Sequence, residues 1–161
     1  MALADLITGG QPISNEDETL SLVTNGEDCN HRELRRELEQ RGHCFRTLTD
    51  VKVILHLYEE LGTNCFQRLN GMFAVAILDN RSGTLILRRD RCGMEPLYYS
   101  ETRVGFLFAS EPGVILTSQI LEGPWSCARK ILRHEKHDSY NIVHHPFFDQ
   151  DGGRVMYSEG T

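Results

Sequence analysis

The sequence predicts an α+β fold, because two helical segments precede two β-hairpins. Apolar residues recur at helical spacing over 49–62, and the charged segment 30–42 has the same period with fewer apolar positions. The apolar run at 72–78 is typical of a strand buried on both faces, and a turn at 80–83 leads into a second strand. Residues 97–109 repeat this pattern of strand, turn and strand. We therefore expect a helical region followed by antiparallel sheet, not alternating βα units.

A further strand is expected near the N-terminus. Residues 8–17 are rich in Gly, Pro, Ser, Asn and Asp, which favour loops and turns. After this loop, Leu20 and Leu22 alternate with their neighbours, as in a strand with one buried face. The alternation ends at Asn25-Gly26, a pair that is common in turns. The strand is therefore expected to break at this pair.

The first helix is expected to begin after Asn30 and to end near Gly42. Asn30 and Glu33 have the spacing of a capping box, in which each side chain accepts a hydrogen bond from the other residue's backbone N–H. Leu34 and Leu38 are four residues apart among many charged residues. This spacing predicts a surface helix with one narrow buried stripe.

The second helix has a broad apolar face and an unfavourable residue near its start. Thr49 is expected as its N-cap and Gly62 as the residue that ends it. The apolar face comprises Val51, Ile54, Leu55, Tyr58 and Leu61. Lys52 occupies the position where a capping box has Glu or Gln, and its charge opposes the positive end of the helix dipole. Lys52→Glu is therefore predicted to stabilise the protein by about 1 kcal/mol.

The character of the chain changes near Glu111. Pro112-Gly113 is expected to block a helix, and from His134 onward the sequence has no clear period. Residues 1–111 are therefore predicted to form the domain. Residues 112–161 are left as an unassigned, irregular C-terminal tail.

Length, charge and hydropathy exclude several classes of protein. A chain of 161 residues is long enough for one domain with a proper core. The net charge of −6 and a pI of 5.6 provide no basic surface for nucleic acid or an anionic membrane. The longest apolar run, 72–78, is far shorter than the roughly 20 residues of a membrane-spanning helix, and Asp5 interrupts any secretory signal. We expect a cytoplasmic protein with no nucleic-acid or membrane partner.

The cysteines and histidines do not predict a metal site. The five cysteines form an odd number without a C-x-x-C pair, which favours reduced thiols over disulfides or zinc ligands. A cluster in the tail has the residue types of a metal site. It comprises His134, His137, His144, His145, Asp149 and Asp151. Because His144 and His145 are adjacent, they would point in opposite directions on a strand. No metal ion and no cofactor are expected.

Several short strings, in a fixed order, support a more specific hypothesis. They are Gly10-Gln11-Pro12-Ile13-Ser14-Asn15, Asn25-Gly26-Glu27, Asn30-His31, Arg68-Leu69-Asn70-Gly71-Met72-Phe73-Ala74, Arg89-Asp90-Arg91-Cys92-Gly93, Pro96-Leu97-Tyr98-Tyr99 and Phe108-Ala109-Ser110-Glu111. In this order and spacing they resemble the class II glutamine amidotransferase domain of glutamine-dependent asparagine synthetases, an N-terminal-nucleophile hydrolase. The resemblance covers residues 5–111 and implies a partial αββα sandwich.

The resemblance assigns roles to four residues. The side-chain amide of Asn25 and the backbone N–H of Gly26 match the two oxyanion-hole donors of the family, and both groups are uncharged donors suited to that task. Glu27 and Asp50 match the residues that bind the α-amino group of glutamine, which needs negative charge. The structural alternative is that Asn25-Gly26 is only a turn and Asp50 only an acid that complements a helix dipole.

Departures from the family predict a catalytically incomplete domain. In the family, the nucleophile is an N-terminal Cys, whose own α-amine is the base, and it lies well before the Gln-Pro string. This chain begins with Met1, and an Arg that binds the glutamine carboxylate in the family is also expected to be missing. Cys29 is next to the oxyanion pair, but as an internal residue it has no α-amine. Asp28, Lys52 and Glu95 replace a family Ile, Glu and Lys.

Three readings of function follow from the resemblance. The first is an asparagine-synthetase-like glutaminase domain that binds glutamine weakly and is inactive by itself. It would associate with a synthetase partner, since the adenylating domain of the family has no counterpart in residues 1–161. It could also associate with itself, since the missing N-terminal strands would leave a sheet edge or an apolar face uncovered. The alternatives are a non-catalytic binding or regulatory module with a remnant glutamine pocket, and a truncated gene product.

Overall fold

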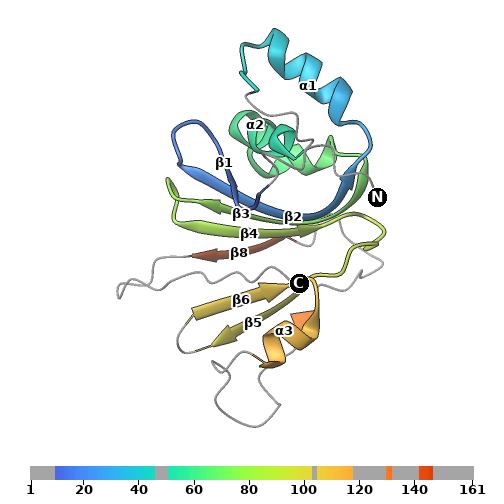
Figure 1. Cartoon of the computed structure of the whole chain (residues 1–161). Coiled ribbons are helices and arrows are strands. Elements are labelled where there is room, and N and C mark those ends of the chain that lie inside the picture. The colour runs from blue at the N-terminus through green and yellow to red at the C-terminus, as the bar shows by residue number, and fades with distance from the viewer. Residues whose placement is uncertain (1–9, 46–50, 103–104, 118–129, 132–141, 147–161) are drawn as a thin grey trace.

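The computed structural model describes residues 10–45, 51–102, 105–117, 130–131 and 142–146. In Figure 1 these residues form four layers, with two helices above a large sheet, a smaller sheet below it, and a short helix on the far side of the smaller sheet. This order of layers is the αββα arrangement that the resemblance implies. The predicted α+β class is confirmed.

The larger sheet has five strands, all antiparallel to their neighbours, in the order β1-β2-β3-β4-β8. The strands are β1 (Ile13–Ser14), β2 (Leu20–Asp28), β3 (Gly71–Asp79), β4 (Thr84–Arg89) and β8 (Ile142–Pro146). The predicted hairpin is therefore β3 and β4, with its turn at 80–83. Strand β8 comes from the segment that the sequence left unassigned, and it pairs Thr84–Arg88 with Ile142–Pro146.

The smaller sheet has the order β6-β5-β7, with β5 (Tyr98–Thr102), β6 (Gly105–Ala109) and β7 (Lys130–Ile131). The second predicted hairpin is thus β5 and β6. Helix α3 (Pro112–Thr117) packs against both of these strands. The expectation that Pro112 blocks a helix is wrong, because Pro is favourable in the first helical turn, where its missing N–H has no intrahelical partner.

Two α-helices and a 3₁₀ helix cover the face of the larger sheet that points away from the smaller one (Figure 1). They are α1 (His31–Gln40), α2 (Lys52–Leu61) and η1 (Gly62–Gln67). Leu34 and Leu38 form the narrow buried stripe predicted for α1. No helix among the described residues is long and apolar enough to cross a membrane.

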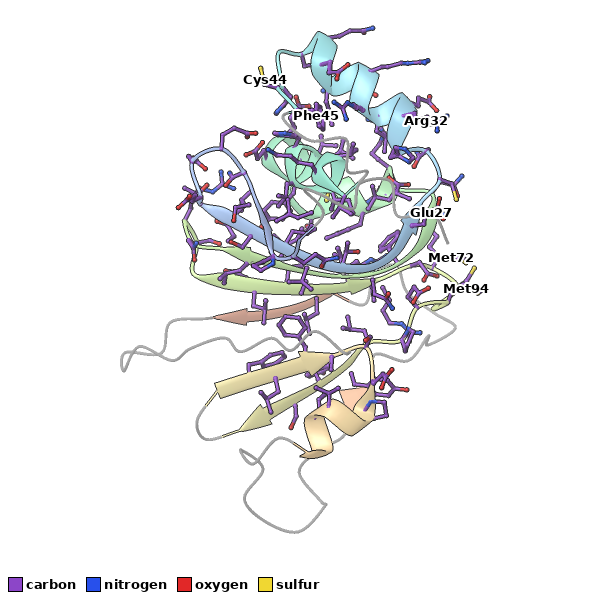
Figure 2. All side chains as sticks on the ribbon, viewed as in Figure 1. Glu27, Arg32, Cys44, Phe45, Met72 and Met94 are labelled. Atoms are coloured by element: carbon purple, nitrogen blue, oxygen red, sulfur yellow. The ribbon has the colours of Figure 1, made fainter. Side chains whose placement is uncertain are left out.

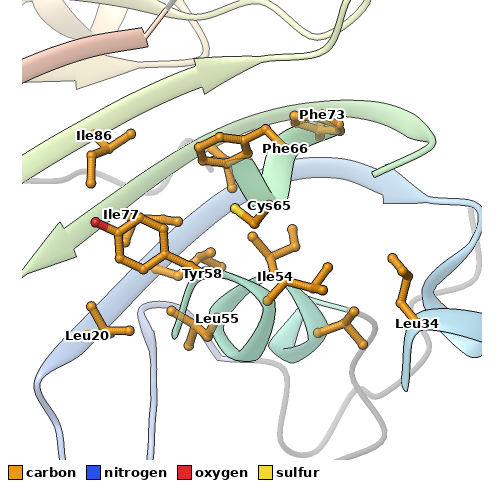
Figure 3. Close-up of a cluster of buried hydrophobic side chains, with 14 of the residues drawn as sticks. Leu20, Leu34, Ile54, Leu55, Tyr58, Cys65, Phe66, Phe73, Ile77 and Ile86 are labelled. Carbon is orange, nitrogen blue, oxygen red and sulfur yellow. The ribbon is translucent and has the colours of Figure 1, made fainter. Parts of the chain in front are cut away.

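Strand β3 separates two apolar cores. Phe73, Val75 and Ile77 belong to the core beneath the helices, whereas Ala74 and Ala76 face the smaller sheet. Figure 3 shows side chains of the helical layer, among them Tyr58, Cys65 and Phe66, against Phe73 and Ile77. Burial on both faces explains why β3 reads as a continuous apolar run, and the prediction for 72–78 is confirmed apart from exposed Met72 and half-buried Leu78.

The predicted capping box of α1 does not form. The Asn30 side chain makes no cap hydrogen bond; its Oδ1 accepts from Asn70 N at 2.9 Å and its Nδ2 donates to Arg68 O at 2.9 Å. Glu33 N–H is satisfied by the backbone oxygen of Asn30 at 3.1 Å. Asn30 therefore joins the start of α1 to the segment that leads into β3, a long-range role that local spacing does not reveal.

The interpretation of Lys52 as an unfavourable residue is also wrong. Thr49 lies outside the described residues, and α2 begins after Val51. Lys52 is only 6 % exposed, and its Nζ donates to Glu16 Oε1 at 2.7 Å. Burial raises the pKa of Glu16, but the hydrogen bond and charge of Lys52, with a contribution from His56, outweigh this effect and hold the pKa below its usual value. The loop before β2 thus supplies the partner that Lys52 requires.

Candidate functional site

The predicted site residues lie near the C-terminal end of β2. The strand does not break at Asn25-Gly26, as the sequence suggested, but continues to Asp28, with Asn25 paired to Ala74 and Gly26 to Phe73. Figure 2 shows Glu27 at this end of the sheet, on the same side of the molecule as Met72 and Met94. Asn25 and Glu27 are both exposed. The end of β2 therefore presents polar groups to solvent.

Gly26 is required by its backbone. Its φ of +115° lies in the region that residues with a side chain rarely adopt. A Cβ at this position would be 2.0 Å from the carbonyl oxygen of Met72 and 2.9 Å from Cα of Phe73. Both atoms belong to the backbone of β3, so they cannot rotate away. Strands β2 and β3 can therefore approach this closely only because residue 26 is glycine.

The alternation of backbone groups directs Gly26 N–H away from β3. Phe73 lies opposite Gly26, but its backbone bonds to Asp90 and not to β2. Its N–H donates to Asp90 Oδ2 at 3.3 Å, and its C=O accepts from the Asp90 N–H at 2.8 Å. Two residues before Gly26, the backbone of Thr24 is bonded on the β1 side, where its N–H donates to Gln11 Oε1 at 2.7 Å and its oxygen accepts from Gln11 Nε2 at 2.8 Å. Since residues two apart in a strand point the same way, Gly26 N–H faces that edge of β2 as well.

The loop 91–95 beside β2 is organised by Asp90. Its carboxylate accepts hydrogen bonds from the backbone N–H groups of Cys92 at 2.8 Å, Met94 at 3.0 Å and Glu95 at 3.3 Å. Converging N–H donors are the partners that a buried carboxylate needs, and Asp90 is 7 % exposed. One side chain, that of Asp90, therefore accounts for the compact form of the loop.

Arg89 holds the same loop from the other direction. Its Nε donates to the backbone oxygen of Glu95 at 2.6 Å, and its Nη2 donates to the backbone oxygen of Gly93. Gly93 has a φ of +62°, which fits the reversal of the chain around the guanidinium. Arg89 and Asp90 together fix the position of Glu95.

Glu95 is thereby brought to Asn25. The Asn25 side-chain amide donates from Nδ2 to Glu95 Oε2 at 2.6 Å. An amide that donates to a carboxylate is oriented toward negative charge, which is the charge that an oxyanion develops. In this structure, Glu95 therefore occupies the donor that the resemblance assigns to the oxyanion hole.

Glu95→Ala is expected to free the Asn25 amide without unfolding the protein. The pair is solvent exposed, so its loss should change stability by about 0.5 kcal/mol or less. The side-chain amide resonances of Asn25 in ¹⁵N-labelled protein should move toward the shifts of a solvated amide. Glu33→Ala on α1 is the matched control and should leave them in place; unchanged Asn25 resonances in the Glu95 variant would contradict the contact.

The cysteines of the described part differ in exposure. Cys65 is fully buried, and burial raises the pKa of its thiol to about 12, so it remains protonated and packs as an apolar residue. Cys29, Cys44 and Cys92 are exposed.

Asp28, which precedes Cys29, has a buried carboxylate that accepts hydrogen bonds from Asn30 N and Asn70 N at 3.3 Å each. Asp28 thus serves as an anchor for the end of β2.

Other predicted residues fall outside the described part of the chain. Asp50 lies there, as do His134, His137 and the two acids of the tail cluster, Asp149 and Asp151. The role of Asp50 therefore stays a prediction. Sequence reasoning assigned no role to Gln11, Arg89 or Asp90. Their only signal was that each falls within one of the strings that carry the resemblance.

Comparison with known proteins identifies the family. Residues 1–149 match the family model described as a glutamine amidotransferase domain. The chain belongs to this family. The domain is 41 % identical over 111 residues to asparagine synthetase [glutamine-hydrolyzing] 2 of Bacillus subtilis, which covers 69 % of this chain and 15 % of that protein. It is 45 % identical over 112 residues to asparagine synthetase [glutamine-hydrolyzing] 3 of Arabidopsis thaliana, with 69 % and 19 % covered.

Solved structures agree with this assignment. Glutamine phosphoribosylpyrophosphate amidotransferase from B. subtilis, complexed with ADP and GMP, matches this amidotransferase domain with a TM-score of 0.57 and 26 % identity, over 65 % of this chain and 25 % of the other. A second structure, titled as the allosteric regulatory enzyme of purine biosynthesis, gives a TM-score of 0.55 at 26 % identity, over 65 % and 24 %. The predicted family and its N-terminal-nucleophile hydrolase fold are confirmed. The chain spans less than a fifth of the curated relatives it matches.

Proposed function

We propose that the end of β2 binds the amino acid glutamine and stabilises the oxyanion formed at its side-chain amide. The observation that carries this proposal is the pairing of two uncharged donors, Asn25 Nδ2 and Gly26 N–H, at one exposed strand end. Asn25 already donates to the Glu95 carboxylate, so its amide can serve a negatively charged oxygen. If a glutamine substrate displaced the Glu95 side chain, its carbonyl oxygen would accept a hydrogen bond from the same amide.

The chemistry follows from what these donors stabilise. Attack of a thiolate on the side-chain carbonyl of glutamine places negative charge on that oxygen, and two preorganised donors lower the energy of this state. When the intermediate collapses, the carbon–nitrogen bond breaks and ammonia leaves after gaining a proton. Water then releases glutamate from the thioester. Asn25 and Gly26 supply no proton, so they act through electrostatics alone.

Glu27 supplies recognition at the other end of the substrate. Its exposed side chain follows Gly26 directly and carries the negative charge that an α-ammonium group requires. Asp50 is the second proposed acid. Because the chain spans so little of its relatives, a synthetase partner that consumes the ammonia is a proposal as well, as is a location in the cytoplasm.

A binding titration tests this function directly. Binding is measured, not turnover, because the proposal concerns how Asn25, Gly26 and Glu27 recognise glutamine, and binding reports on these residues whichever group supplies the nucleophile. L-Glutamine added to ¹⁵N-labelled protein should shift the Asn25 side-chain amide and the Gly26 N–H in a saturable manner. L-Glutamate and D-glutamine are the controls for the side-chain amide and for the α-carbon.

Variants assign the two ends of the ligand. Glu27→Gln should weaken binding by about tenfold, since it removes one charged hydrogen bond. Glu33→Gln removes the same charge from α1 and should bind as the parent protein does. If no saturable shift occurs at residues 25 and 26, or if Glu27→Gln binds glutamine unchanged, the proposed site is wrong.

A further inference from the structure

A cluster of potential metal ligands lies in the helical layer, on elements separate from the end of β2. Three ligand atoms converge there, namely His43 Nδ1, His56 Nδ1 and Glu59 Oε2. The two imidazole nitrogens are 3.1 Å apart, His56 Nδ1 is 2.8 Å from Glu59 Oε2, and His43 Nδ1 is 3.7 Å from the same oxygen. A tetrahedral zinc ion with bonds of about 2.0–2.1 Å separates its ligand atoms by about 3.3 Å. The three observed distances between ligand atoms, 2.8, 3.1 and 3.7 Å, lie on both sides of this value.

The far side of each imidazole faces a carboxylate. His43 Nε2 is 3.0 Å from Glu60 Oε1, and His56 Nε2 is 3.8 Å from Glu16 Oε1. Among the described residues, His56 Nε2 has no hydrogen-bond partner, although the imidazole is almost fully buried. A proton on each Nε2, directed toward its carboxylate, leaves the lone pair of each Nδ1 for the centre of the cluster. Metal-bound histidines are commonly held in this way.

The third ligand is oriented as well. Glu59 Oε1 accepts from Asn15 Nδ2 at 2.8 Å, and this hydrogen bond leaves Oε2 turned toward the two imidazoles. His56 and Glu59 are three residues apart on α2, a spacing that places both on one face of a helix. His43 comes from the segment that follows α1. The three ligands thus join two segments of the helical layer.

The local environment suits a divalent ion. The side chains of His43 and Glu59 are 20 % and 21 % exposed, whereas that of His56 is 2 % exposed. Solvent can therefore reach the cluster from one side, where water would complete the coordination. The ring of Phe45, labelled in Figure 2 near the helices, makes a T-shaped contact with the His56 ring, and the ring centroids are 4.7 Å apart. Imidazole and carboxylate together favour zinc over magnesium or calcium, which prefer oxygen ligands alone.

We propose that His43, His56 and Glu59 form a zinc site that joins the segment after α1 to α2. Zinc at this site uses three protein ligands and one water molecule. Because the ion binds the folded protein, it raises stability. Glu60 and Glu16 are positioning residues, which act on the metal only through the histidines. The site is independent of the proposed glutamine site and places no demand on it.

Thermal unfolding of the full 161-residue chain with metal tests this proposal. After treatment with a chelator and under reducing conditions, saturating Zn²⁺ should raise the midpoint by about 5 °C, with one ion bound per chain in a calorimetric titration. Mg²⁺ at the same concentration should have no effect. If zinc neither binds nor stabilises the protein, the cluster is a hydrogen-bonded network and not a metal site.

Matched variants locate the ion. His43→Gln should lose zinc binding while still folding, because its side chain is partly exposed. Glu59→Gln provides a second test that leaves both histidines in place. Glu60→Gln should weaken binding by about tenfold without abolishing it, as expected of a positioning residue. His31→Gln and Cys44→Ser should bind zinc as the parent does. Binding that survives in both ligand variants would place the ion elsewhere and overturn the proposal.

Discussion

Gly26→Ala is expected to destabilise the protein by more than about 4 kcal/mol or to prevent folding altogether. The added Cβ would sit 2.0 Å from the Met72 carbonyl oxygen and 2.8 Å from its carbon, and the φ of +115° adds strain of its own. Relief requires β2 to separate from β3, the central strand of the larger sheet. Urea unfolding followed by circular dichroism measures the effect.

Gly10→Ala is the matched control for this substitution. Apart from its chain neighbours, no atom of the described residues lies within 4 Å of a Cβ built at Gly10, so stability should change by about 0.5 kcal/mol or less. Gly71→Ala should resemble Gly26→Ala, since its Cβ would lie 2.2 Å from the carbonyl oxygen of Glu27. A Gly26→Ala protein that unfolds within 1 kcal/mol of the parent would mean that the two strands do not approach as described.

Lys52→Glu is expected to destabilise the protein by about 2–3 kcal/mol, the reverse of the gain that local helix rules predict. The new carboxylate would be buried beside Glu16, which loses its partner at the same time. Glu16 keeps about a third of its side chain exposed, so the loss should be smaller than for a fully buried pair. Thermal unfolding at pH 7 measures the change, and a raised midpoint would restore the sequence-based interpretation.

A pH series separates the charge of Lys52 from its packing. Lys52→Met keeps the apolar stem but removes the ammonium. Because the folded pKa of Glu16 lies below its usual 4.5, the contribution of the pair is fully present above that pH and is lost as the pH falls through the folded pKa. The difference between the parent and Lys52→Met should therefore be constant from pH 5 to 7 and shrink toward pH 3. A constant difference throughout would assign the effect to packing alone.

The elements that were predicted correctly depend on local pattern. The existence of α2 and the hairpin of β3 and β4 follow from periods of 3.6 and 2, which a short stretch of sequence displays in full. The predicted apolar face of α2 was too narrow, because Lys52, Val53, His56 and Leu57 are buried as well. Strand β2, which carries the candidate site, was harder to predict from local pattern. Asn25-Gly26 has the composition of a turn, and only the close approach of β3 shows why glycine stands within a strand.

Two of the wrong predictions, those for Asn30 and Lys52, share a physical cause. Asn30 and Lys52 were interpreted through their neighbours in sequence, yet their partners are Asn70 and Glu16, 40 and 36 residues away. Helix-capping rules describe an isolated helix, and tertiary hydrogen bonds replace them wherever a side chain reaches another segment. The same limit hid Glu95, which meets Asn25 only because Arg89 and Asp90 shape the intervening loop.

The hydrogen bonds between Gln11 and Thr24 fix the direction in which the chain runs along the β1 edge of the larger sheet. Strand β1 is antiparallel to β2, and from Ser14 back to Gln11 the chain advances along β2 toward Gly26. At Gln11 the described chain, followed backward, is thus heading toward Asn25 and Gly26, whereas β8 forms the opposite edge of the sheet. For protein engineering, attachment before β1 is therefore the geometry by which a reactive side chain can be delivered to Asn25 and Gly26.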